Sequence, residues 1–91
     1  MNREDLVYIV KKVRREVEKR NRNMLDGNIG NNTLDEYLEK SGSYIHGLCI
    51  GVSYMCDDMK ISEYIENKFY SKMVDELLET YDICKLLEEN N

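Results

Sequence analysis

The most reactive side chains of the sequence are His46, Cys49 and Cys56, which lie within one short segment. His46 and Cys49 are three positions apart, so on a helix they would share one face and could hold a metal ion between them. A structural zinc site usually needs four ligands, and the helical angles turn His46 away from Cys56, towards Ser53 and Asp57. The pair also lacks a third group that would orient a nucleophile and its base. The sequence therefore predicts no catalytic residue, no metal site and no cofactor.

The carboxylates and glycines offer no stronger catalytic signal. Glu63 and Glu66 form a single carboxylate pair, without the histidine that di-iron helical bundles place on the same helix. Gly27 and Gly30 lack the spacing, the lysine and the preceding strand of a phosphate-binding loop. We therefore expect a protein that is not an enzyme.

The cysteines indicate a cellular compartment. On one helix the Cα atoms of Cys49 and Cys56 would lie about 10 Å apart, beyond the disulfide limit of about 7 Å. An odd number of cysteines and the lack of a signal-peptide pattern favour free thiols in a reducing compartment. The weakly polar run from Tyr44 to Cys56 is too short to span a bilayer. We expect a cytoplasmic protein with no membrane contact.

Apolar residues recur at helical spacing along the 91-residue chain, and no segment alternates like a strand. Asn2 and Ser62 are expected to cap the first and last helices, and Thr33 with Glu36 matches a capping box. The segment Ser41-Gly42-Ser43 is expected to end or kink the second helix. The sequence thus predicts one all-α domain over residues 1–91, a small four-helix bundle-like fold with helices at about 3–22, 34–40, 44–59 and 62–87.

The predicted helix 44–59 contains two glycines, Gly47 and Gly51, in line with Ser43. A glycine inside a helix lowers helix stability by about 1 kcal/mol relative to alanine, so two of them in one helix need an explanation. One interpretation is that the glycines allow a neighbouring helix to approach closely. The other is that they are merely tolerated in a buried helix. Met55 and Met59 are assigned to the apolar, inward face of this helix.

The predicted helix 62–87 carries apolar residues around more than half of its circumference. One neighbouring helix cannot bury so wide an arc, so we expect it to contact two helices or a second subunit. A break near residues 80–82 is the simpler alternative. Self-association would also stabilise so short a chain. We therefore predict a homo-oligomer, in its simplest form a homodimer, that forms through Ile65, Phe69, Tyr70, Met73, Leu77 and Tyr81.

The formal charge of −5 is unevenly divided: residues 1–23 carry +4 and residues 24–91 carry −9. Basic residues of the first helix line up opposite its apolar stripe, beside Tyr8. Part of their charge is expected to be neutralised within the helix, because Glu16 and Glu18 precede Arg20 and Arg22 by four residues. The predicted basic face comprises Lys11, Lys12, Arg15, Lys19 and Arg22. The predicted acidic face comprises Asp57, Asp58, Glu63, Glu66, Asp75, Glu76 and Glu79.

Several interpretations of these charged faces remain open. The basic face is a solvated surface, a site for an acidic protein (in a homo-oligomer, the acidic half of a neighbouring copy), or a site for nucleic-acid phosphates. One interpretation of the acidic face is that its carboxylates imitate such phosphates and occupy a basic groove on a partner. A helical protein without alanine but rich in Asn, Lys and Ile is typical of AT-rich genomes, including phages and other mobile elements. We expect a small protein-binding protein that inhibits or regulates a larger protein; the alternative is a nucleic-acid-binding regulator that uses the basic face.

Overall fold

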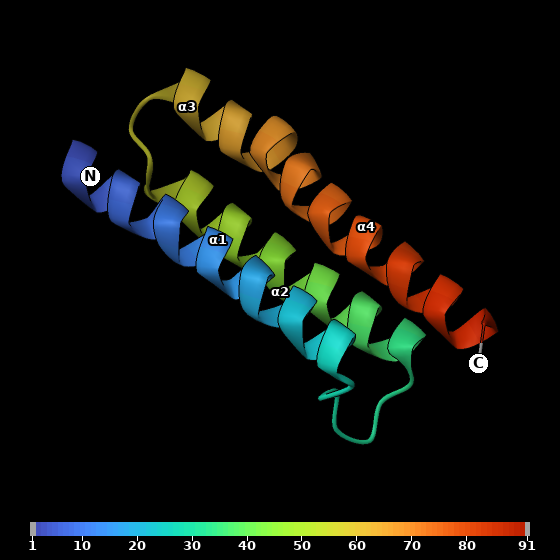
Figure 1. The fold of residues 1–91 in the computed structure, drawn as a ribbon. Helices are drawn as coiled ribbons and strands as arrows, with labels where there is room; N and C mark the ends of the chain where they lie inside the picture. The colour runs from blue at the N-terminus through green and yellow to red at the C-terminus, as the bar shows by residue number, and fades with distance from the viewer. Residues whose placement is uncertain (1, 91) are drawn as a thin grey trace.

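The computed structural model describes residues 2–90, and all regular secondary structure in this part of the chain is helical. Three rods pack side by side: α1 (Arg3–Asp26), α2 (Leu34–Met55), and a third formed by α3 (Met59–Tyr64), η1 (Ile65–Phe69) and α4 (Tyr70–Glu89) in direct succession (Figure 1). Each rod contacts the other two, in a bundle of 49 × 18 × 17 Å. The all-α class is confirmed, but the bundle has three rods where four helices were predicted.

Side-chain caps begin the first two rods at the predicted residues. The Asn2 side-chain oxygen accepts a hydrogen bond from the Asp5 backbone N–H at 2.8 Å. Thr33 and Glu36 form the complete capping box: the Thr33 hydroxyl accepts from the Glu36 N–H at 3.1 Å, and the Glu36 carboxylate accepts from the Thr33 N–H at 2.9 Å. These bonds satisfy backbone donors that have no partner within the helix, which fixes where each helix starts.

The end of α1 is set by a glycine. Gly27 adopts a φ of 74°, in the left-handed region, and the Asn28 N–H donates to the Asn23 carbonyl at 2.8 Å. This Schellman arrangement satisfies carbonyls of the last turn and reverses the chain. It extends α1 to Asp26, one turn beyond the predicted end at Arg22.

The predicted break at Ser41-Gly42-Ser43 is wrong, because α2 passes through it as one continuous helix. Ser41 is fully buried, and its hydroxyl accepts a hydrogen bond from the Arg20 guanidinium of α1 at 3.3 Å. The serine that looked like a helix end in the sequence is therefore a polar contact between two helices. The predicted helices 34–40 and 44–59 are one helix, and it ends at Met55 rather than Met59.

The small residues of α2 do not bring another helix close. Ser43, Gly47 and Gly51 are exposed, and a Cβ built on either glycine meets nothing within 4 Å. The interpretation as a close helix contact within the chain is therefore wrong. These glycines are tolerated on the solvent side of α2, not in a buried helix.

The third rod begins three residues before the predicted start, at Met59. Asp58 caps it, since its carboxylate accepts from the N–H groups of Lys60 and Ile61 at 2.8 and 3.2 Å. Ser62, the predicted cap, lies inside the rod instead. Its hydroxyl oxygen lies 2.6 Å from that of the buried Ser53, which ties the third rod to the end of α2.

A π-helical turn keeps the apolar stripe of the third rod on the core side. Ile65, Phe69, Met73 and Leu77 recur every four residues, and in a regular α-helix such a stripe rotates by about 40° at each step. The turn η1 contains more residues than an α-helical turn and so reduces this rotation. All four side chains are buried. The rod continues through residues 80–82 to Glu89, so the alternative of a break there is wrong.

The core draws on all three rods. It runs along the bundle axis and consists of small and medium apolar side chains together with one aromatic ring. Its buried members are Val13, Val17, Met24, Leu34, Ile45, Cys49, Val52, Ile65, Phe69, Met73, Leu77 and Cys84.

Candidate binding surfaces

The reactive side chains of α2 do not form a site in the described residues. Cys49 is fully buried, and burial raises the pKa of its thiol to about 11, which keeps it protonated near neutral pH. His46 points outward, with its ring centroid 4.9 Å from that of Tyr70. Among residues 2–90 no three His, Cys, Asp or Glu side chains gather where a metal ion would fit.

The basic face is a continuous exposed ridge on α1. All five predicted residues are exposed, on the side opposite the buried Val13, Val17 and Met24. From Lys11 to Arg22 the ridge is about 16 Å long at 1.5 Å per residue. None of its members forms an ion pair with another described residue. The ridge therefore presents its full positive charge to solvent.

The expected neutralisation within α1 is wrong. Within residues 2–90 neither Glu16 with Arg20 nor Glu18 with Arg22 forms an ion pair. Arg20 instead turns towards α2, where its guanidinium bonds to Ser41 and lies 4.4 Å from the centre of the Tyr44 ring. It therefore belongs to the contact between α1 and α2, and such a cation–π pair favours the packed state.

The acidic residues are all exposed, but they lie on separate parts of the surface. Asp57 and Asp58 precede α3, and Asp58 is used as its cap. Glu63 lies on α3 and Glu66 on η1, where a Glu66 oxygen lies 3.5 Å from the Ser53 hydroxyl. Only the members on α4 share one helix; they are Asp75, Glu76 and Glu79.

The wide apolar arc of the third rod is covered within the chain. Ile65, Phe69, Met73 and Leu77 are buried against the other rods, and Tyr70 and Tyr81 are half-buried. Both α1 and α2 pack on this rod, which confirms the expected contact with two helices. Self-association is not needed to bury these six residues.

A polar cluster ties the start of α2 to the end of α4. The Tyr81 hydroxyl donates to the Asp35 carboxylate, and the Lys85 ammonium lies 3.4 Å from the same oxygen. The Tyr81 hydrogen bond and then the Lys85 cation lower the pKa of Asp35. The carboxylate in turn raises the pKa of both Tyr81 and Lys85.

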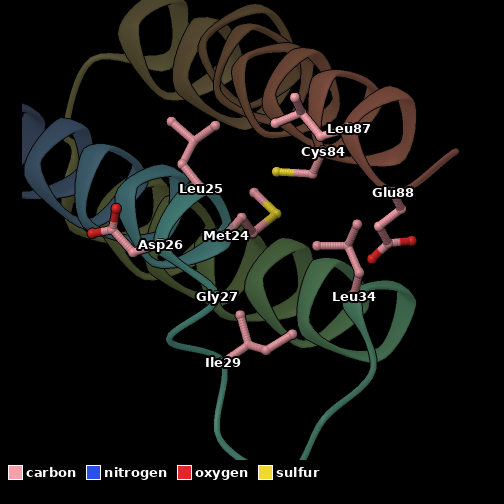
Figure 2. Close-up of a pocket in the computed structure, with 9 residues that line it drawn as sticks. All are labelled: Met24, Leu25, Asp26, Gly27, Ile29, Leu34, Cys84, Leu87 and Glu88. Atoms are coloured by element: carbon pink, nitrogen blue, oxygen red, sulfur yellow. The ribbon is translucent and has the colours of Figure 1, made fainter. Parts of the chain in front are cut away.

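The loop end of the bundle contains a hollow of about 290 Å³ between α1, the loop, α2 and α4. Figure 2 shows the sulfur atoms of Met24 and Cys84 turned towards its interior, with Leu34 and Ile29 beside them. Burial, with a smaller contribution from Glu88, raises the pKa of the Cys84 thiol. The hollow is therefore lined mainly by uncharged, weakly reactive groups, and it offers space without catalytic chemistry.

The opposite end of the bundle is more open. The α1 backbone packs on α2 and α4 but does not come close to α3 or η1 within the described residues. More than half of the large apolar side chains that the described chain exposes belong to this end, where α1 begins, α2 ends and α3 begins (Figure 1). We call this set the open end; it consists of Val7, Tyr8, Tyr54, Met55, Met59, Ile61 and Tyr64.

The sequence analysis missed the open end, because it assigned Met55 and Met59 to an inward face. Tyr54 is 85% exposed and Met59 is 75% exposed. A hollow of about 500 Å³ lies between α1 and the end of α2, lined by Asp5, Tyr8, Ile9 and Met55. The one local signal was the charge-free run that closes α2, followed directly by two aspartates.

No helix of residues 2–90 is both long enough and apolar enough to cross a membrane. No protein family, curated protein or solved structure matches this chain.

Proposed function

We propose that this protein acts by binding another protein through the open end, and that it inhibits or regulates that larger partner. The supporting observation is that more than half of the large apolar side chains exposed by the described residues lie at the open end. Large apolar side chains gathered at one place on a surface favour an interaction site, because their exposure to water is unfavourable until a partner covers them.

The composition of the open end supports protein rather than small-molecule recognition. Tyrosine and methionine are enriched in protein interfaces, where they supply large contact areas, and methionine adapts to irregular partners. The hollow beside Tyr8 and Met55 would receive one apolar side chain of the partner. Charges of both signs border this region: Asp5 lines the hollow, and Arg3, Glu4 and Lys11 surround Val7 and Tyr8 on α1.

Replacing two exposed side chains tests this proposal without disturbing the core. The variant Tyr54→Gln with Met59→Gln removes apolar surface from the open end, whereas Leu25→Gln with Leu86→Gln does so at the loop end, where both leucines are exposed. In pull-downs from the cells that encode the protein, the wild type and the loop-end variant should retain the same partner. The open-end variant should lose it while its circular dichroism is unchanged. Equal recovery with all three proteins would contradict the proposal.

The basic ridge supports a second candidate function, nucleic-acid binding. Its five cations are exposed and not engaged in ion pairs within the described chain, and Tyr8 stands at its start. Lysines and arginines along one helix face fit a phosphate backbone, and such binding weakens steeply with salt. Fluorescence anisotropy with short duplex DNA and RNA at low salt tests it: Lys11→Glu with Arg15→Glu should abolish binding. Absence of binding by the wild type at low salt would exclude this candidate.

A further inference from the structure

The exposed side chains of the open end supply the area that one side of a stable protein interface needs. Tyr8, Tyr54 and Tyr64 are 61%, 85% and 49% exposed. A whole aromatic side chain buries about 150–250 Å², so these three tyrosines together expose about 300–500 Å². Each partner in a standard interface contributes about 800 Å², and the tyrosines alone supply about half of that area. The other apolar side chains of the open end add to it.

The α1 border of the open end carries charges of both signs. Asp5 lines the hollow beside Tyr8, and on the other side of this ring the charged neighbours are Arg3, Glu4 and Lys11. A two-fold contact brings each patch against the same patch of the other copy, so a border of one sign would repel its copy. With two acids and two bases, this border has an opposite charge available for each of its own charges.

The open end also contains both a protruding ring and a space. Met55, the last residue of α2, lines the hollow of about 500 Å³, and Tyr54 directly precedes it in the sequence. Tyr54 is the most exposed of the large apolar residues of the described chain. Each copy of the chain therefore brings an exposed aromatic ring and an apolar hollow to a contact between two open ends.

We propose that a second copy of this chain covers the open end, so that the protein forms a two-fold dimer through it. The area fits a stable dimer, and the mixed charges of the border are compatible with a copy of themselves. The self-association predicted from the sequence thus has its interface at the open end, because the apolar arc of the third rod is already covered by α1 and α2.

The dimer would occupy the surface through which the proposed partner binds. Such a partner binds only to the monomer, so its apparent affinity decreases as the concentration of the chain itself rises. This competition rests on the proposed function, whereas the dimer does not. Self-association would in this way regulate how much of the protein is available to its partner.

Sedimentation velocity of the purified chain tests the dimer. The wild type should be dimeric at high micromolar concentration and should dissociate on dilution. Tyr54→Gln with Met59→Gln should raise the dissociation constant at least about a hundredfold, because a two-fold contact loses each apolar side chain twice. Leu25→Gln with Leu86→Gln, which changes exposed leucines at the loop end, should leave the dissociation constant unchanged. Circular dichroism of both variants should match that of the wild type.

Salt separates this contact from one made by the basic ridge. Salt screens ion pairs between exposed charges, whereas it does not weaken apolar contacts. The dissociation constant should therefore stay within about threefold between low and high sodium chloride. Arg15→Glu with Lys19→Glu, which reverses part of the ridge, should also leave the dimer intact. A dimer that high salt or this variant dissociates would overturn the proposal.

The dimer and the proposed function fail in different measurements. A wild type that stays monomeric at high micromolar concentration would overturn the dimer, and so would two glutamine variants that dimerise equally. If that monomeric wild type still recovers a partner that the open-end variant loses, the proposed function stands without the dimer. If the purified protein dimerises through the open end but recovers no partner from the cells that encode it, the dimer stands without the proposed function.

Discussion

Gly27 and Gly47 have opposite conformational requirements. Gly27 follows α1 with a φ of 74°, which side-chain-bearing residues adopt only with strain, whereas Gly47 lies inside α2 with open space where a Cβ would be. Gly27→Ala should therefore destabilise the fold by about 1 kcal/mol. Gly47→Ala should stabilise it by about 0.5–1 kcal/mol, because alanine is the better helix former.

Urea unfolding of the two alanine variants measures both effects against the wild type. Destabilisation by Gly47→Ala would contradict the open environment that the structure gives this glycine. It would also indicate that a helix of another molecule packs closely against α2 at Gly47.

The Asp35 cluster should make a small part of the stability depend on pH. The Tyr81 hydrogen bond is the largest cause of the lowered Asp35 pKa, followed by Lys85. A carboxyl whose pKa is lower in the folded than in the unfolded chain stabilises the fold above the unfolded value of 3.8. This contribution is lost as the pH falls through the lower, folded value.

Tyr81→Phe removes the hydroxyl and should raise the Asp35 pKa towards 3.8. Carboxyl-carbon NMR titration of the wild type and the variant reads this shift directly, and Lys72→Met serves as a control because Lys72 is not among the causes of the Asp35 shift. An unchanged Asp35 pKa in Tyr81→Phe would show that the hydrogen bond is not formed in solution.

At the scale of elements, local signals predicted helix starts well and helix continuity poorly. The caps at Asn2 and Thr33 are confirmed, because a cap depends only on residues a few positions away. The break at Ser41 and the cap at Ser62 are wrong, because both hydroxyls are engaged with another helix. Serine favours turns in isolation, and only the packed structure shows that its hydroxyl has a distant partner.

The same distinction explains which surfaces the sequence predicted. The basic face follows from the helical periodicity of α1 alone, and its residues are exposed as expected; the predicted acidic residues are also exposed, but they lie on separate elements. The open end depends on where α2 stops and on how α1 lies relative to α3, which no local pattern specifies. Met55 and Met59 have the right spacing for a core face, yet both are exposed because the helix ends between them.

Adjacent leucines of α4 test the assignment of the apolar arc to the core. Leu77 is fully buried, while Leu78 is 40% exposed. Leu77→Ala should destabilise the fold by about 2–5 kcal/mol, through lost apolar burial and the cavity left behind. Leu78→Ala should cost less than about 1 kcal/mol. Thermal and urea unfolding would measure both changes in stability. A Leu77→Ala variant that keeps its stability but changes its oligomeric state would show that Leu77 lies in a subunit interface.

At the scale of the whole molecule, three regions of the surface differ in their chemistry. The loop end contains the hollow lined by Met24 and Cys84, the basic ridge runs along α1, and the open end lies furthest from the loop. Protein binding through the open end and nucleic-acid binding through the basic ridge should therefore respond to different substitutions.

The central claim is that the open end contacts a partner protein, and site-specific photocrosslinking tests it most directly. A photoreactive phenylalanine derivative in place of Tyr54, which is 85% exposed, samples the open end, and the same derivative in place of the exposed Glu39 on α2 samples the side of the bundle. In the cells that encode the protein, position 54 should form a covalent adduct with one larger polypeptide, and position 39 should not. No adduct at position 54, or equal adducts at both positions, would contradict the claim.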